Sequence, residues 1–165
     1  LTATTTACQA SCTSLFVGSV RGVYETGKKT FGKPLSVKQG IQFPLVELQS
    51  QIEMLRALIH KTAWAMDKYG AFSVSDKVSM CNYQANRLCC DAADRAMQVH
   101  GGLGYSRHKP FEHIYRHHRR YRITEGAEEI QMHRIDGYML FLYTIAPSVR
   151  YRGRILRAHH DSHEH

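Results

Sequence analysis

The stretch IQFPLVELQSQIEMLRALI, residues 41–59, decides the fold of this chain. Its large apolar residues recur at alternating steps of four and three, at Ile41, Leu45, Leu48, Ile52, Leu55 and Ile59. This spacing places them on one side of an α-helix with 3.6 residues per turn. The pattern continues until Tyr69 and Gly70, so we predict a long helix that packs one apolar face against a core.

The segment that follows repeats this pattern with smaller side chains. Its stripe consists of Val78, Cys81, Ala85, Leu88, Ala92, Ala96 and Val99, and the glycines Gly101 and Gly102 close it. Because Ala and Cys are small, the stripe predicts a second long helix that its neighbours approach closely.

Three further helices complete the predicted architecture. They cover residues 1–26, a basic segment from Pro110 to about Tyr121, and a last segment from near Gly126 until Pro147. A connector with glycine and proline breakers joins the first to the second, and no useful β alternation is present. We therefore predict an all-α, up-down four-helix bundle for residues 1–146. Residues 147–165 are expected to form an extension with a disordered polar end.

Length and composition limit the class of protein. At 165 residues and 43% apolar content, the chain suffices for one domain with a buried core. It contains no apolar run of about 18 residues, so we expect no membrane span. The N-terminus LTATTTACQASC lacks the features of a signal peptide and an initiator Met. We interpret the chain as part of a longer protein.

The chain has five cysteines, at Cys8, Cys12, Cys81, Cys89 and Cys90. The odd number and the helical spacing among small residues predict reduced, buried thiols in an intracellular compartment. Because no CxxC pair is present, we do not expect a cysteine zinc site.

The net charge of +8 concentrates in RHKPFEHIYRHHRRYR, residues 107–122. Such a segment is compatible with nucleic acid, with a solvated or interface-facing helix, or with a metabolite that carries several phosphates. His113 and His117 have i, i+4 spacing, and His118 follows. No carboxylate completes an HExxH-type arrangement, and neighbouring arginines would repel a cation, so we predict a solvated basic face and no metal.

The motif GGLG, residues 101–104, follows a predicted helix. A phosphate-binding loop needs a strand before the glycines and a helix after them. We therefore predict a helix C-cap and turn. Because glycines have no side chain, a second role also stays open, in which another molecule approaches the backbone of this motif closely.

The motif RITEGAEEIQ, residues 122–131, places Glu125 directly before a glycine. Glu125 could complement the dipole of the following helix, or it could accept a proton in a pocket. Glu128 and Glu129 already supply acids to the first turn, which leaves Glu125 free for the second role.

Two dense segments together resemble one family. KKTFGKPLSVKQGIQFPLVELQSQIE (residues 28–53) and AMQVHGGLGYSRHKPFEHIYRHHRRYRITEGAEEIQ (residues 96–131) are similar to the C-terminal helical-bundle domain of acyl-CoA dehydrogenases. The resemblance extends from Thr2 to about Leu142, in the order and spacing of the family.

This resemblance implies an enzyme that desaturates an acyl-CoA thioester between its α and β carbons. Glu125 occupies the Glu position of the family's YEG motif, and would remove the α proton while a β hydride passes to N5 of FAD. Thr124 and Gly126 would contact the substrate. Some family members place the base on the first helix, but LTATTTACQASC contains no acid.

The resemblance also implies FAD contacts, some of them across a subunit boundary. Segment 98–102, which comprises Gln98, Val99, His100, Gly101 and Gly102, would lie beside the FAD of a neighbouring subunit. The remaining expected contacts are Lys28, Phe31, Gln39, Ala127, Glu128 and Glu129. The basic charge then suits FAD and CoA, which are both polyanions, and we expect no nucleic-acid partner.

The implied partners are further copies of the chain in a dimer of dimers, the acyl-CoA substrate and an electron-transfer flavoprotein. The expected location is the mitochondrial matrix or the bacterial cytoplasm. The family's N-terminal and middle domains are absent from this chain, so we expect the fragment alone to be inactive. The alternatives are a non-catalytic oligomerisation bundle and a basic bundle that binds nucleic acid.

Several positions depart from the family pattern. Lys28 stands where an arginine is usual, which removes bidentate anion recognition. Thr124 replaces a common tyrosine beside the expected base. Ala127 and Glu128 replace Thr-Ser, which removes hydroxyl donors and adds negative charge near a pyrophosphate.

Overall fold

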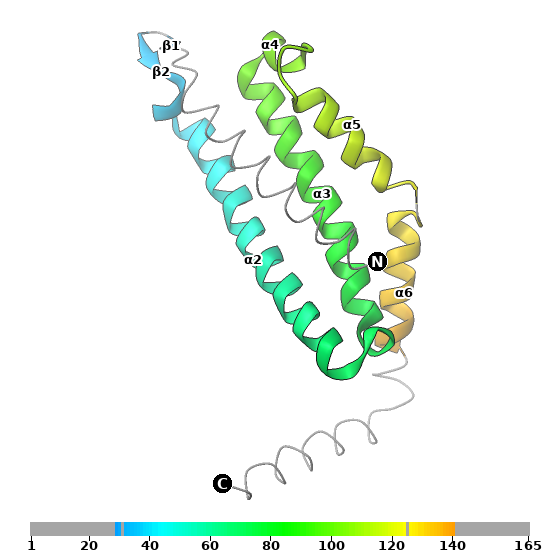
Figure 1. The fold of residues 1–165 in the computed structure, drawn as a ribbon. Coiled ribbons are helices and arrows are strands. Elements are labelled where there is room, and N and C mark those ends of the chain that lie inside the picture. Colours follow the sequence, from blue (N-terminus) through cyan, green and yellow to red (C-terminus); the bar gives the residue numbers. More distant parts are fainter. Residues whose placement is uncertain (1–28, 31, 125, 141–165) are drawn as a thin grey trace, which may run out of the picture.

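A computed structural model describes residues 29–30, 32–124 and 126–140 (Figure 1). The elements in chain order are strands β1 (Lys29–Thr30) and β2 (Lys33–Pro34), a 3-10 helix (Leu35–Val37), α2 (Gln39–Tyr69), a second 3-10 helix (Ala71–Val74), α3 (Ser75–His100), α4 (Gly102–Tyr105), α5 (Phe111–Tyr121) and α6 (Glu128–Leu140).

Helix α3 is the central element of the described bundle. Figure 1 shows α2 antiparallel to α3 on one side, while α5 and α6 follow one another along the other side. Tyr138 fixes the far end of α6 to the start of α3. Its hydroxyl accepts a hydrogen bond from Ser75 Oγ at 2.6 Å and donates one to the carbonyl of Phe72 at 2.9 Å.

The core lies where α2 and α3 face each other. Leu48 and Ile52 of α2 pack with Leu88 and Ala92 of α3, and Leu55 lies against this group. Small residues form most of the buried face of α3, namely Cys81, Ala85, Cys89, Cys90, Ala92, Ala93 and Ala96. Their size allows close contact with helices on two sides, as the sequence predicted.

The predicted fold class, an all-α up-down four-helix bundle, is confirmed. The helices at 41–69, up to 99 and at 110–121 are found within two residues of their expected ends. The connector differs from the prediction, because a two-residue antiparallel ladder joins β1 to β2 around Gly32, whose φ is 78°. Residues 1–26 and the extension at 147–165 lie outside the described residues, and the domain boundary at 146 stays a prediction.

The three cysteines that the structure describes divide into two states. Cys81 and Cys90 are buried free thiols, as expected. Cys89 is disulfide-bonded, so the prediction of reduced thiols is wrong at this position. The helical spacing placed Cys81, Cys89 and Cys90 in the core correctly but carried no information about pairing. Cys8 and Cys12 lie outside the described residues.

Candidate functional site

The junction between α5 and α6 carries the candidate catalytic residue. Glu125 itself lies outside the described residues, but the backbone on both sides is described. The amide of Thr124 and its hydroxyl both donate to the carbonyl of Arg120, at 2.9 and 3.2 Å. Gly126 has φ of 95°, a conformation that side chains disfavour, and a Cβ there would meet Gln131 Nε2 at 3.1 Å. The junction is therefore a tight turn that requires its glycine.

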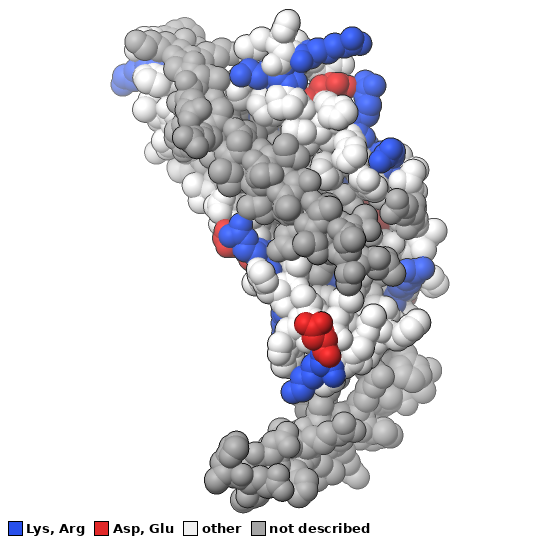
Figure 2. Space-filling view, in the orientation of Figure 1, with Lys and Arg blue, Asp and Glu red and all other residues white. Residues whose placement is uncertain are grey.

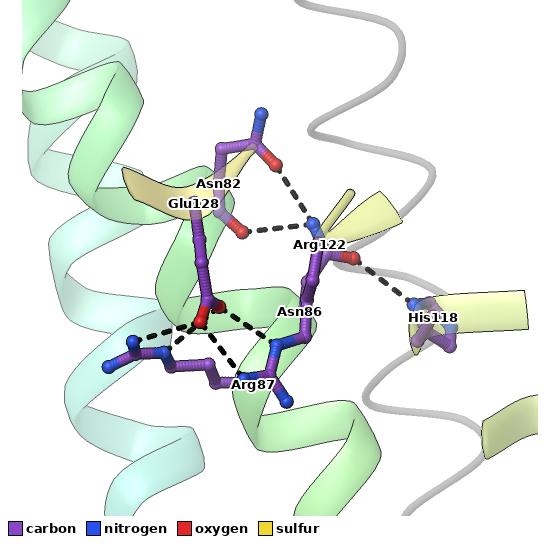
Figure 3. A network of polar contacts seen from close by, with 6 residues as sticks. All are labelled: Asn82, Asn86, Arg87, His118, Arg122 and Glu128. Atoms are coloured by element: carbon purple, nitrogen blue, oxygen red, sulfur yellow. Dashed lines mark hydrogen bonds and ion pairs between the residues drawn. The ribbon is translucent and has the colours of Figure 1, made fainter. Parts of the chain in front are cut away.

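The first residue of α6, Glu128, is held by two arginines (Figure 3). Arg122 Nε and Nη2 donate to its two carboxylate oxygens at 2.8 and 3.0 Å. Arg87, on α3, donates in the same two-point manner through Nε and Nη2, each at 3.1 Å. This Arg87–Glu128–Arg122 ion-pair network joins three elements, because Arg122 directly follows α5.

The ion-pair network fixes the charge of Glu128. Hydrogen bonds from Arg122, and then from Arg87, lower the pKa of the Glu128 carboxyl to about 2. The same carboxylate raises the pKa of both guanidinium groups, so all three residues are charged at neutral pH. Two positive charges surround the one negative charge of Glu128. Although Glu128 departs from the family pattern, it therefore adds no uncompensated negative charge to its surroundings.

A second polar group lies beside the ion-pair network. Asn86 Nδ2 donates to the carbonyl and Oδ1 of Asn82 at 3.1 and 2.9 Å, which turns Asn86 Oδ1 toward His118 Nδ1 at 3.3 Å (Figure 3). The His118 ring is therefore protonated at Nδ1 in this arrangement. Burial lowers the pKa of His118 to about 4, and neighbouring His117 adds to this effect, so the ring is neutral at pH 7.

The burial of His118 corrects the sequence prediction. We expected the histidines of this segment on a solvated face, and His113 and His117 are exposed there. His118 is only 3% exposed. It shares the inward face of α5 with Phe111 and Ile114, at the i, i+3, i+7 spacing that the sequence already contained.

The end of α3 holds the predicted cofactor segment 98–102. His100 Nδ1 donates to the carbonyl of Ala96 at 2.9 Å, and its ring packs on Phe111 with centroids 4.7 Å apart. His100 Nε2 is buried and has no hydrogen-bond partner among the described residues. Gly101, with φ of 65°, ends α3, and a Cβ added at exposed Gly102 would meet nothing within 4 Å. Gln98 is exposed, and Val99 is half-buried.

The structure places the predicted residues in two groups. Gln39, the exposed first residue of α2, lies at the same end of the bundle as segment 98–102 (Figure 1). Thr124, Gly126, Ala127, Glu128 and Glu129 lie at the α5–α6 junction, part of the way down α3. Lys28 and Phe31 lie outside the described residues. One chain therefore does not bring all the predicted residues to a single point.

The charged surface follows α4 and α5. In Figure 2 the blue Lys and Arg side chains gather at the α4 end and along the edge where α5 lies. Its exposed members include Arg107, Arg116, Arg119 and Arg120. Of these, Arg116 pairs with Glu112 at 2.6 Å on the same helix.

Sequence reasoning missed the parts of the site that depend on distant residues. Arg87 lies 41 residues from Glu128, and no local pattern connects them. No local signal singled out Arg87, because other charged residues, Asp76 and Asp94 among them, lie on the same helix.

Comparison with known proteins identifies the class to which this architecture belongs. Residues 17–140 match the family described as acyl-CoA dehydrogenase, C-terminal domain. Because this match covers most of the chain, the chain belongs to the acyl-CoA dehydrogenase family.

Individual relatives agree with this assignment. The chain is 32% identical over 120 residues to the mitochondrial short-chain specific acyl-CoA dehydrogenase of Bos taurus, covering 73% of this chain and 29% of that protein. It is 30% identical over 117 residues to subunit CarC of the caffeyl-CoA reductase-Etf complex of Acetobacterium woodii, covering 71% of this chain and 30% of that protein. The chain thus spans under a third of the length of these relatives.

The solved structures show the same fold. The crystal structure of an acyl-CoA dehydrogenase from Geobacillus kaustophilus superimposes with a TM-score of 0.71 at 25% identity, over 82% of this chain and 34% of that chain. Over the described residues, none of the helices has both the length and the apolar character that crossing a membrane requires.

Proposed function

We propose that these residues form the C-terminal domain of an FAD-dependent acyl-CoA dehydrogenase that desaturates an acyl-CoA thioester between its α and β carbons. The observation that carries this proposal is the family match over residues 17–140, which includes the TEGAEE junction with Glu125 followed by the obligatory turn glycine Gly126.

Glu125 is the proposed base that takes the α proton of the substrate. A carboxylate of ordinary pKa is a weak base toward a thioester α proton, so removal from water and acidification of the substrate must assist it. The neighbouring Glu128 cannot compete for this role, because the two arginines hold its pKa at about 2. The ion-pair network therefore separates the two acids into a reactive residue and a structural residue.

The residues at the end of α3 suit the binding of FAD, the cofactor that the family implies. FAD, when bound, supplies the acceptor for the β hydride. Exposed Gly102 and the turn residue Gly101 leave backbone open to close approach, and the buried acceptor His100 Nε2 has no described partner. We propose that segment 98–102 holds a neighbouring subunit's FAD together with Lys28, Phe31 and Gln39. Ala127, Glu128 and Glu129 lie at the start of α6, whose backbone N–H groups favour a phosphate.

The separation of the two residue groups is compatible with this cross-subunit arrangement. Gln98–Gly102 would serve one flavin site, while the α5–α6 junction would serve another. The partners that we propose are further copies of the chain in a dimer of dimers, the acyl-CoA and an electron-transfer flavoprotein. The proposed location is the mitochondrial matrix or bacterial cytoplasm. The 165-residue chain alone is proposed to be inactive.

The test uses the full-length protein that contains these residues, with Glu125→Gln. Anaerobic mixing with acyl-CoA should bleach the flavin of the unchanged protein, and Glu125→Gln should lose this bleaching while keeping its flavin. Asp136→Asn, an exposed acid on α6, is the matched control and should bleach normally. Undiminished bleaching in Glu125→Gln would remove Glu125 as the base.

A further inference from the structure

Helix α5 carries two exposed histidines, His113 and His117, one turn apart. Residues four apart lie above one another on the same side of an α-helix. The two ring centroids are 6.3 Å apart, and the ring planes differ by only 24°. The two imidazoles therefore form a stacked pair at the surface of the helix. We call these two residues the histidine pair.

The ring nitrogens of the histidine pair have no hydrogen-bond partner among the described residues. The buried histidines differ, because His100 Nδ1 is bound to the carbonyl of Ala96 and His118 Nδ1 to Asn86. Imidazole is the commonest metal ligand in proteins, and two histidines four apart on one helix supply two of the ligands in helical zinc sites. The histidine pair therefore offers two available nitrogen ligands from a single turn.

The spacing of the two rings suits one shared metal ion. Metal–imidazole nitrogen bonds of about 2.0–2.1 Å put each ring centroid roughly 3 Å from the ion. At a tetrahedral angle the two centroids would then lie roughly 5 Å apart, so the present 6.3 Å has to shorten by only roughly 1 Å. Small side-chain rotations at the surface supply this movement. The His117 ring also packs edge-on against Tyr121, with centroids 5.1 Å apart, which restricts one of the two rings in advance.

The charges around the histidine pair are partly offset. From the sequence we expected neighbouring arginines to repel a cation. In the structure, however, Arg116 Nη2 lies 2.6 Å from Glu112 Oε1, so a carboxylate compensates the arginine that shares this turn. The guanidinium of Arg120 lies over the Tyr121 ring, 4.9 Å from its centroid. The remaining positive charge lowers the affinity for a metal ion without excluding it, which revises the expectation from the sequence.

The ligand set selects the kind of metal. Within the described ranges, no group of three or more His, Cys, Asp or Glu residues is arranged to hold a metal ion. The protein would therefore supply two nitrogen ligands, and water would supply the others. Nitrogen ligands favour Cu²⁺, Ni²⁺ and Zn²⁺, whereas Mg²⁺ and Ca²⁺ prefer oxygen. We propose that the histidine pair chelates one divalent ion of this late first-row class, with Cu²⁺ bound most tightly.

Such a chelate would stabilise the folded chain. The fold holds α5 in place, because Phe111 is buried and His118 contacts Asn86 on α3. An unfolded chain does not keep the two imidazoles one helical turn apart, so an ion that binds both favours the folded state. The site lies before the α5–α6 junction and depends on neither flavin nor acyl-CoA.

The test follows urea unfolding of the 165-residue chain at several Ni²⁺ concentrations up to about 100 µM, because the rise of the midpoint gives the Kd. We expect Ni²⁺ to raise the midpoint of the wild-type chain relative to a sample with chelator. His113→Gln and His117→Gln should each raise the Kd at least about tenfold. All variants keep the same histidines near the C-terminus, so a difference between variants does not report them: His159, His160, His163 and His165.

Two control variants separate a chelate from general affinity for histidine. His133→Gln removes an exposed histidine on α6 and should leave the Kd unchanged. The double variant His117→Gln/Arg119→His keeps the number of histidines, but at a spacing of six that puts them on different sides of the helix. It should bind Ni²⁺ as weakly as His117→Gln, although it has lost a positive charge.

Three outcomes would overturn the proposal. The first is a wild-type midpoint that Ni²⁺ leaves unchanged. The second is a Ni²⁺ shift that survives in His113→Gln and His117→Gln, since the ion would then bind elsewhere. The third is a shift in His117→Gln/Arg119→His as large as in the wild type. None of these results concerns flavin bleaching by the full-length protein, so this proposal and the proposed function fail separately.

Discussion

The two connections that follow α3 are built in different ways. At the α3–α4 turn the chain reverses through glycines, and buried Gly104 lies so close beneath His100 that a Cβ there would be 2.7 Å from His100 Cβ and 2.8 Å from the Met97 carbonyl oxygen. At the α5–α6 junction, the Arg87–Glu128–Arg122 network and the His118–Asn86 contact hold the chain.

This difference predicts how the stability of each connection depends on pH and salt. The glycine turn depends on shape, which pH and salt leave unchanged. The junction depends on which groups are ionised, and it carries the residue proposed to be the base. A partly buried ion pair is stable only while all its members are present, because a lone charge left behind loses its compensation.

Glu128→Gln tests the charged connection most strongly. Without the carboxylate, two guanidinium groups face each other across a neutral side chain, so we expect a loss of about 3 kcal/mol in the free energy of unfolding. Urea unfolding followed by circular dichroism measures it. Arg87→Gln is the companion variant and should cost about 1 kcal/mol, since Arg87 is 39% exposed and Arg122 remains. A stability of Glu128→Gln equal to wild type would show that the ion-pair network does not hold the junction.

The pH dependence of unfolding tests the neutral histidine. The pKa of His118 falls from its ordinary 6.5 to about 4 on folding. Below pH 6.5 the unfolded chain therefore takes up a proton that the folded chain refuses. The stabilisation is complete above pH 6.5 and is lost as the pH falls toward 4. Between pH 7 and pH 5 we expect a loss of about 2 kcal/mol.

His118→Gln should remove most of the fall in the free energy of unfolding between pH 7 and pH 5. Urea titrations at each pH measure it. The contribution of Glu128 to stability changes in a separate pH range. Because its pKa is lowered on folding, this carboxylate stabilises the folded chain above pH 4.5, and that stabilisation is lost as the pH falls toward 2. If the wild-type and His118→Gln curves ran parallel from pH 7 to pH 5, His118 would not be the responsible group.

Gly104→Ala tests the connection that depends on shape. The added methyl group would overlap His100 Cβ and the Met97 backbone, so we expect a loss of about 1.5 kcal/mol at any pH between 5 and 8. Gly137→Ala is the matched control, since nothing lies within 4 Å of its Cβ position on α6, and the better helix former should raise stability. Thermal melts of both variants at two pH values provide the measurement, and a strong pH dependence for Gly104→Ala would contradict the comparison.

Local patterns predicted the helices, because each is defined by residues three and four apart. The stripe from Ile41 to Ile59 and the glycine stop at Gly101 needed no knowledge of the rest of the chain. The α5–α6 junction could be located but not understood in this way. Its geometry depends on Arg87, which belongs to another helix. Its histidine looked solvated because arginines surround His118 in the sequence, although the ring is buried in the fold and contacts Asn86 of another helix.

The two free thiols among the described residues, Cys81 and Cys90, are internal reporters of local opening. Burial raises the pKa of Cys90, which contacts Arg122 at the α5–α6 junction, and likewise raises the pKa of Cys81, which lies 3.6 Å from Thr62 between α2 and α3. Neither thiol reacts readily while it is enclosed. The rate at which a thiol reagent modifies Cys90 therefore measures how often the junction opens, and Cys81 measures separation of the two long helices. A single labelling time course can thus rank the kinetic stability of the two regions within one folded chain.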